Sequence, residues 1–211
     1  MENPFSNTQQ KTFQAQQLSE ERARVFMRQV YMTMALGLAI TGLTAWFVSQ
    51  NLALMQFFFS GFMRYIVMFA PLGIVIFLAA RVQKMSFNQA SLAFAVYSLV
   101  NGISFATIFF VYDLGAIYRV FLITAGTFGA MALIGMTTKA DLSKMGSILY
   151  MALIGLIIAM LVNFFMQSSM FDYIISILGV LIFCGLTAYD NQKLMRIGSQ
   201  IEVETDGTRK I

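Results

Sequence analysis

Residues 173–193 read YIISILGVLIFCGLTAYDNQK, and this stretch decides the fold. Its first part, 173–189, carries no charged residue, and the polar segment that follows begins at Asp190. A helix that crosses a bilayer needs about 20 predominantly apolar residues. The stretch therefore predicts a membrane-spanning α-helix that ends close to Asp190.

The whole chain has the composition of such a stretch. Of its 211 residues 58% are hydrophobic and 11% are charged, whereas soluble domains are about 25% charged. Proline occurs only 2 times beside 21 phenylalanines and 16 methionines, which favours helices over a barrel of alternating polarity. We predict an all-α membrane protein, a polytopic helical bundle with a transmembrane domain over 25–211 and the lipid bilayer as its solvent. The predicted spans are 30–48, 65–80, 90–111, 120–137, 148–165 and 173–189.

The lysines and arginines predict the orientation of these spans. Twelve of the 14 lie in alternate segments that would share one side of the membrane, and two lie in the others. Cytoplasmic loops carry the excess of Lys and Arg, so the N-terminus is predicted to be cytoplasmic. Because these residues flank apolar runs, where they set topology, we predict no nucleic-acid partner.

Residues 1–24 form a polar stretch before the first span. They are rich in Gln, Ser and Asn and show no hydrophobic stripe, which predicts a disordered cytoplasmic tail. The loops between spans are short, so no soluble catalytic domain is expected within the chain.

Several residue types needed for catalysis are missing. The chain has no histidine, which removes the commonest general base and metal ligand. Its single cysteine, Cys184, lies in an apolar run. No phosphate loop or clustered metal ligands are present. We predict that the protein is not an enzyme and has no cofactor.

Asp190 is the main candidate site residue. It follows the uncharged run 173–189, and an acid near the C-terminal end of a helix opposes the macrodipole. The alternative is an ordinary surface pair with Lys193, if the helix continues to a cap at Gly198. Arg81 is expected at a similar depth, so an Asp190–Arg81 pair is allowed; the alternative is an arginine that only snorkels to the interface.

Other polar residues have simpler interpretations. Asp172 is predicted to cap the last helix, and Asp113 to lie in an external turn. Asn101 and Asn163 are expected to form hydrogen bonds across helices. Small residues four apart predict close helix packing: Ala125 with Gly129, Gly126 with Ala130, and Gly155 with Ala159.

Three motifs carry a family resemblance: LTAYDNQKL at 186–194, TTKADLS at 137–143 and NFF at 163–165. With them the chain resembles the Bax inhibitor-1 (transmembrane Bax inhibitor motif) family, in its bacterial inner-membrane branch, from about Met27 to Ile211. The resemblance implies a protein of the bacterial cytoplasmic membrane with six helices around a seventh, C-terminal helix.

The resemblance also implies a pH-sensitive calcium leak. In that family an aspartate of the sixth helix shares a proton with one of the seventh, and an arginine of the second helix latches onto it. Asp190 matches the first aspartate and Arg81 the arginine, so Asp190 is the expected calcium or proton site. The chain ends at Ile211, where the family would begin its seventh helix, and we expect a truncated form.

Two functions follow as hypotheses. The first is a pH-sensitive calcium leak channel or transporter, with calcium as the transported species. The second is a non-conducting regulator that binds another membrane protein, such as a membrane-anchored protease, through its polar N-terminal segment.

Overall fold

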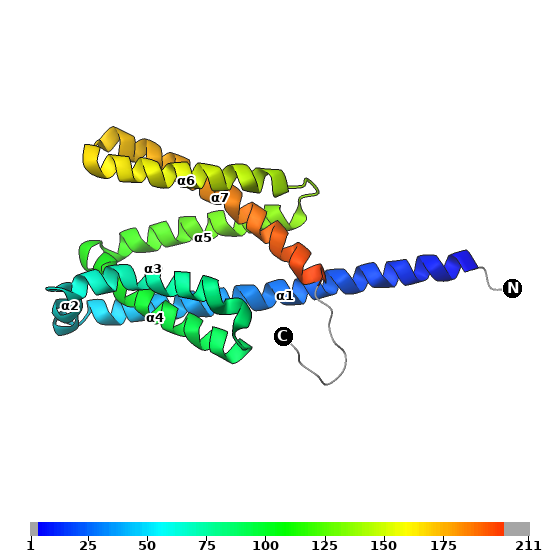
Figure 1. The fold of residues 1–211 in the computed structure, drawn as a ribbon, viewed down its shortest axis with the longest axis horizontal. Helices are drawn as coiled ribbons and strands as arrows, with labels where there is room; N and C mark the ends of the chain where they lie inside the picture. Colours follow the sequence, from blue (N-terminus) through cyan, green and yellow to red (C-terminus); the bar gives the residue numbers. More distant parts are fainter. Residues whose placement is uncertain (1–3, 201–211) are drawn as a thin grey trace. The chain divides into compact units, whose positions relative to one another are not determined.

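The computed structural model describes residues 4–200 (Figure 1). The predicted seventh helix and the end of the chain at Ile211 lie outside that range. Within it the chain is helical and contains no strand, which confirms the all-α prediction. The helices are α1 (Pro4–Ser49), α2 (Leu52–Phe59), α3 (Met63–Arg81), the 3-10 helix η1 (Val82–Lys84), α4 (Phe87–Val111), α5 (Leu114–Thr137), α6 (Ser143–Met166) and α7 (Ser169–Gln200).

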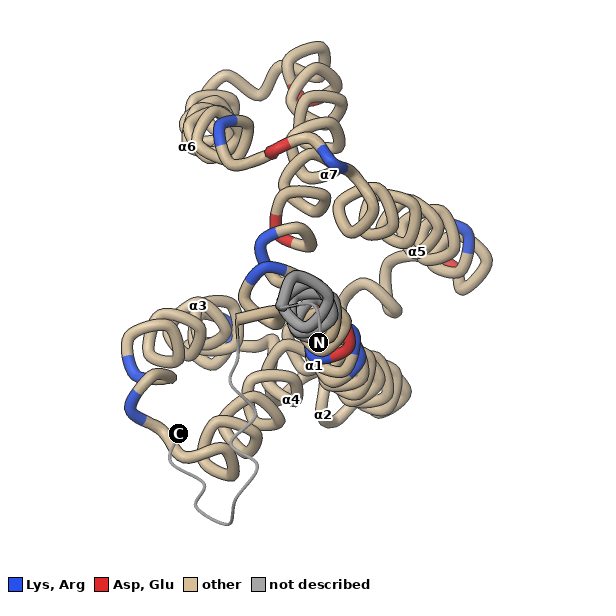
Figure 2. Tube along the Cα trace, turned by 90° about the vertical axis from the view of Figure 1, so that its right-hand side faces the viewer, with Lys and Arg blue, Asp and Glu red and all other residues tan. Residues whose placement is uncertain are grey.

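Six helical segments of the described chain are long and apolar enough to cross a membrane, and each contains one predicted span. The shortest, Met63–Lys84, has 22 residues, about 33 Å of helix against a hydrocarbon core of about 30 Å. The polytopic helical bundle is therefore confirmed. Figure 2 shows long stretches of the described tube without charged residues. The segments are Gln17–Ser49, Met63–Lys84, Phe87–Val111, Leu114–Thr137, Ser143–Met166 and Ser169–Gln200.

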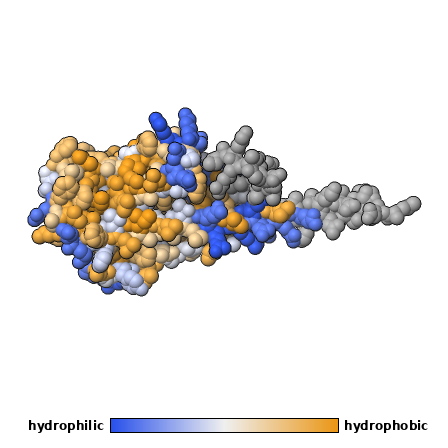
Figure 3. Space-filling view, turned by 90° about the horizontal axis from the view of Figure 1, so that it is seen from below, coloured by the Kyte–Doolittle hydropathy of each residue, from blue (hydrophilic) through white to orange (hydrophobic). Residues whose placement is uncertain are grey.

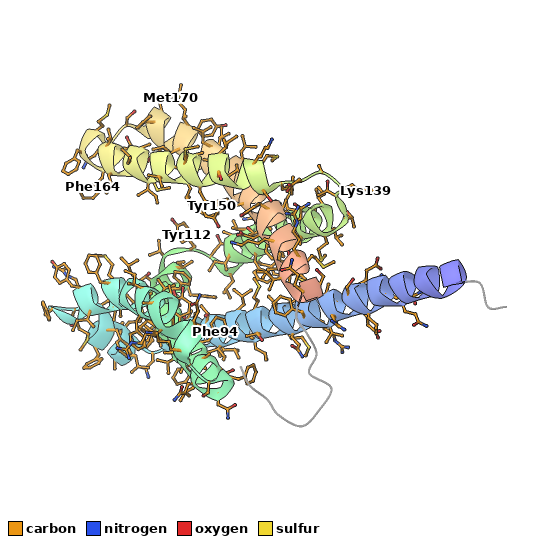
Figure 4. All side chains as sticks on the ribbon, turned by 45° about the vertical axis from the view of Figure 1, so that its right-hand side comes forward. Phe94, Tyr112, Lys139, Tyr150, Phe164 and Met170 are labelled. Carbon is orange, nitrogen blue, oxygen red and sulfur yellow. The ribbon has the colours of Figure 1, made fainter. Side chains whose placement is uncertain are left out.

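Side chains are distributed as expected for a protein in lipid. Large apolar residues face outward, as Figure 3 shows for one face. Phe164 and Met170, at the α6–α7 turn, are 75% and 70% exposed (Figure 4). Buried positions include small or polar residues such as Ala106 and Ser98, which suits helices that associate by close packing and hydrogen bonds.

The N-terminal segment differs from its prediction. Helix α1 begins at Pro4 and continues into the first span, so residues 4–24 are helical rather than disordered. Gln, Glu, Lys, Arg and Ala in this segment are good helix formers, and proline suits a first helical position. Ala23 and Met27 are buried, and Gly198 of α7 lies against Ala23 and Phe26. Contacts at Ala23 and Phe26 hold α1 against α7, and the helix continues from there back to Pro4.

The described chain forms two compact units, and the transmembrane domain predicted over 25–211 stays a prediction. The middle unit consists of residues 29–120. The outer unit combines residues 4–28 with 121–200. Helices α1 and α5 each contribute residues to both units.

In the middle unit, hydroxyl groups join neighbouring helices. Thr41 Oγ1 of α1 donates to the carbonyl of Ser98 in α4 at 3.0 Å. Ser104 Oγ of α4 donates to the carbonyl of Val67 in α3 at 2.7 Å. The helical partner of that carbonyl would be residue 71, which is proline and has no N–H. The Ser104 hydroxyl therefore satisfies a carbonyl that Pro71 leaves free.

The outer unit is built on the α6–α7 hairpin. Its apolar core consists of four buried side chains: Leu156, Ile175, Ile182 and Leu186. Helix α5 crosses α7 at Gly135, where an added Cβ would collide with the backbone of Ala188. The predicted small-residue contacts are different: a Cβ at Gly126, Gly129 or Gly155 would meet no described atom within 4 Å. Close helix approach thus occurs at other glycines than those predicted.

Candidate functional site

A buried glutamine fixes the α5–α6 loop to α7. Gln192 Oε1 accepts a hydrogen bond from the backbone N–H of Leu142 at 3.0 Å. Its Nε2 donates to the carbonyl of Ala140 at 2.8 Å. One side chain therefore satisfies two loop backbone groups that have no partner in a helix.

Arg196, one helical turn further along α7, adds an ion pair to the same loop. Its Nη2 donates to Asp141 Oδ1 at 2.7 Å, and its Nη1 donates to Ser143 Oγ at 3.0 Å. The backbone N–H of Ser143 bonds the Asp141 carboxylate, and with the Arg196 guanidinium it holds the pKa of Asp141 well below its usual range. We call Asp141, Ser143, Gln192 and Arg196 the polar clasp.

The sequence interpretation did not identify the polar clasp. Three of its members lie in motifs that marked the family, TTKADLS and LTAYDNQKL, but were given no role. The available signal was the spacing of Gln192 and Arg196, which are four residues apart and share one face of a helix. That face has a partner only because the helix continues past residue 189 to Gln200.

Asp190 lies on α7 beside α6. Tyr150 of α6 donates its hydroxyl to Asp190 Oδ1 at 3.4 Å, a long hydrogen bond. The rings of Tyr150 and Tyr189 meet edge to face, with centroids 6.1 Å apart. Gly146 of α6 lies against the Tyr189 ring, where a Cβ would collide with it. Aromatic packing therefore fixes the helix position that presents Asp190 at the surface.

The predicted alternative for Asp190 was a surface pair with Lys193. The described residues contain no ion pair between them. Lys193 Nζ instead lies 6.0 Å from the centroid of the Tyr189 ring. Gly198 does not end the helix; it lies inside α7, where it allows the close approach of α1.

Arg81 is the last residue of α3 and belongs to the middle unit. Its guanidinium carbon lies 5.6 Å from the centroid of the Phe77 ring, and the residue is exposed. Asp190 belongs to the outer unit, so the pairing of Asp190 with Arg81 stays a prediction.

The described residues contain no group of three or more His, Cys, Asp or Glu side chains that could hold a metal ion. Calcium takes six to eight oxygen ligands. Asp190 with the Tyr150 hydroxyl would supply only part of such a shell. The calcium prediction for Asp190 remains a prediction.

The other polar residues are placed as follows. Ser168, not Asp172, caps α7, because its hydroxyl accepts the N–H of Phe171 at 3.3 Å. Asp172 lies in the first turn and accepts a hydrogen bond from Asn163 Nδ2. Asn163 therefore joins α6 to α7 as predicted.

Asn101 differs from its prediction. Its Nδ2 donates to the carbonyl of Tyr97 in its own helix at 3.0 Å, and the residue lines a cavity of about 650 Å³ between α3 and α4. Asp113 lies in the turn before α5, as predicted, and accepts the N–H of Ala116 at 2.9 Å.

The fold and these contacts define a polytopic α-helical membrane protein. Within that class, the chain belongs to the family described as inhibitor of apoptosis-promoting Bax1, which matches residues 23–205. The match covers both units and confirms the Bax inhibitor-1 resemblance.

Relatives from several bacteria are similar to this chain. The inner membrane protein YbhL of Escherichia coli K12 is 42% identical over 189 residues, which cover 89% of this chain and 81% of YbhL. Uncharacterized proteins of Borreliella burgdorferi and Deinococcus radiodurans are 41% and 39% identical; the alignments cover 86% and 90% of this chain and 78% of each relative. No solved structure matches the chain.

Proposed function

We propose that this membrane protein carries a pH-responsive calcium leak across a bacterial cytoplasmic membrane, with Asp190 as its ion or proton site and Arg81 as its latch. The observation that carries the proposal is how few contacts the Asp190 carboxylate makes. Among the described residues it has no ion-pair partner, and its contact is one long hydrogen bond from Tyr150. Such a carboxylate is free to bind a proton or a cation.

The contrast with Asp141 supports the choice of Asp190. Asp141 accepts hydrogen bonds from the Ser143 backbone and from Arg196, which satisfy its charged form. Asp190 follows a long apolar stretch of α7 and has no comparable set of donors. Ionisable groups close to the apolar part of a membrane helix are costly and are retained mostly for function.

The test is calcium flux into liposomes that contain the 211-residue chain, measured across a range of pH. We expect the wild-type flux to depend on pH and Asp190→Asn to remove that dependence, because asparagine cannot exchange a proton. Glu20→Gln is the control: its exposed carboxylate pairs with Arg24 at 3.9 Å on α1. The proposal is wrong if wild-type liposomes take up no calcium at any pH, or if Asp190→Asn leaves flux and pH dependence unchanged.

A second candidate is the non-conducting regulator, and the extended helix α1 favours it. Its described part begins at Pro4, well before the predicted span 30–48. The segment 4–22 is a polar helix in a position to contact another protein, such as a membrane-anchored protease.

Two deletions separate the candidates. Deleting residues 1–16 removes most of the polar helix but keeps Ala23 against Gly198. Deleting residues 1–24 removes the whole polar helix and this contact. A regulator would lose its complex with the protease in either deletion, as measured by copurification from the membrane. A leak would keep its calcium flux in the shorter deletion.

A further inference from the structure

The turn that joins α3 to α4 contains a cavity of about 530 Å³. It lies at the end of α3 opposite Arg64, on the predicted cytoplasmic side. Two of its lining residues are cations, and three are apolar. The lining consists of Phe77, Ala80, Arg81, Lys84, Met85 and Gln89.

Among residues 29–120 the two cations have no acidic partner. Residues 29–112 contain neither Asp nor Glu, and the only acid among residues 29–120 is Asp113. Asp113 follows the far end of α4, whose 25 residues extend about 37 Å. That distance exceeds the Debye length of about 8 Å at physiological salt. The positive charge of Arg81 and Lys84 is therefore not compensated by an acid among residues 29–120.

The backbone of the turn adds to the positive electrostatic potential of the cavity. Helix α4 begins directly after it, with Ser86 as N-cap and Gln89 completing a capping box. The N-terminus of a long helix carries a partial positive charge. Arg81 lies with its guanidinium carbon 5.6 Å from the Phe77 ring centroid, which places the cation beside the apolar wall of the cavity. The cavity thus combines charge for an anion with an apolar side.

Two other arginines of the described chain already have hydrogen-bond partners. Arg196 is bound in the polar clasp, and Arg64 donates to the hydroxyl of Tyr65 at 3.0 Å. Arg81 and Lys84 share one cavity and take part in no ion pair among residues 4–200. Basic pockets between membrane helices bind anionic lipid headgroups on the cytoplasmic side.

We propose that this cavity binds the phosphate of an anionic glycerophospholipid from the leaflet on the predicted cytoplasmic side. The phosphate lies between Arg81 and Lys84, and the glycerol lies against Phe77 and Met85. The acyl chains follow the exposed apolar surface of α3, which includes Phe77 and Ile76. This site does not depend on the proposed calcium leak, and it shares only Arg81 with the proposed Asp190 latch.

The test is lipid binding to the full chain in detergent, measured by native mass spectrometry with phosphatidylglycerol and phosphatidylcholine of the same acyl length. Each basic residue near a membrane surface adds to the free energy of binding an anionic lipid. The two residues together should favour phosphatidylglycerol over phosphatidylcholine roughly 30-fold. We expect Arg81→Gln/Lys84→Gln to lose that preference. Arg119→Gln, on α5 and outside the cavity, is expected to keep it.

The single variant Lys84→Gln separates this site from the Arg81 latch, because Lys84 has no part in the latch. We expect it to reduce the preference roughly 5-fold with the melting temperature unchanged. Inorganic phosphate at millimolar concentration should not displace the lipid. Equal binding of both lipids by the wild type, an unchanged preference in the double variant, or displacement by phosphate alone would overturn the proposal.

Discussion

The two units of this protein use their basic residues in different ways. In the outer unit, Arg196 donates to Asp141, Ser143 and Gln192 and so holds a loop against α7. In the middle unit, Arg81 and Lys84 line a cavity and form no ion pair with any residue of that unit. Basic residues at the ends of the described helices thus either join a loop to a helix or take part in no ion pair among the described residues.

The units also differ in how their helices are joined. The middle unit uses hydroxyl-to-carbonyl hydrogen bonds, such as Ser104 to Val67. The outer unit uses a helix crossing at Gly135 and, at its end, the polar clasp. Lipid gives no hydrophobic drive for helix association, so close packing and hydrogen bonds have to supply it.

The largest effect is expected at the helix crossing of the outer unit. Gly135→Ala places a methyl group against the backbone of Ala188, and backbone cannot move aside as a flexible side chain can. We expect a loss of about 1–3 kcal/mol in stability, measured by thermal unfolding in detergent.

Gly126→Ala on the same helix is the control for this prediction. No described atom lies within 4 Å of the added methyl, and alanine is the better helix former by about 0.5–1 kcal/mol. Its stability should be equal to or above that of the wild type. Equal stability of the two variants would mean that α5 does not cross α7 at Gly135.

The middle unit should respond most at Ser104. Ser104→Ala leaves the Val67 carbonyl without the hydroxyl that replaces the N–H missing at Pro71. An unsatisfied buried carbonyl costs about 1–3 kcal/mol, and measured hydrogen bonds between membrane helices suggest the lower part of that range. Unfolding in detergent measures the loss.

A second substitution tests the cause of that loss. Pro71→Ala restores an N–H that can bond Val67, so Ser104→Ala should cost less in the Pro71→Ala background. The double-mutant cycle isolates this coupling. If Ser104→Ala costs the same in both backgrounds, Pro71 is not the reason for the Ser104 hydrogen bond.

These two sites show how far the sequence predicted the structure. The six spans follow from length and apolar composition, which are local properties. The positions of helix crossings do not follow from these local properties, because they depend on which face of a helix contacts a neighbouring helix. Gly126 and Gly135 are nine residues apart, which is 2.5 helical turns, so they lie on opposite faces of α5. The sequence interpretation chose the face of α5 on which a Cβ at Gly126 or Gly129 meets no described atom.

The residues of the candidate site were likewise predicted only in part. Asp190 was identified because one acid after an apolar run is a local signal. The polar clasp was missed because Gln192 and Arg196 acquire their roles only from the path of the α5–α6 loop. The N-terminal helix was missed because polar composition was taken as disorder, although its residues are good helix formers.

The smallest expected effect concerns the charge in the polar clasp. Asp141→Asn keeps an oxygen for Ser143 and Arg196 but removes the negative charge. The pair is solvent-exposed, with side chains 51% and 66% exposed, so the melting temperature should fall by roughly 2–4 °C at most at neutral pH. Arg81→Gln, in the middle unit, should leave the melting temperature unchanged.

The pH dependence of the difference in melting temperature between the wild type and Asp141→Asn identifies the cause of that difference. The folded pKa of Asp141 lies below its ordinary value of 3.8 because the Ser143 backbone and Arg196 favour the charged form. Its contribution is therefore fully present above 3.8 and is lost as the pH falls through the folded pKa. The gap between wild type and Asp141→Asn should be constant from about pH 8 to about pH 5 and should shrink only in stronger acid. A gap that narrows between pH 8 and pH 5 would mean that the Asp141 carboxylate is not held in its charged form by the clasp, and the contrast between the units would then rest on the helix crossings alone.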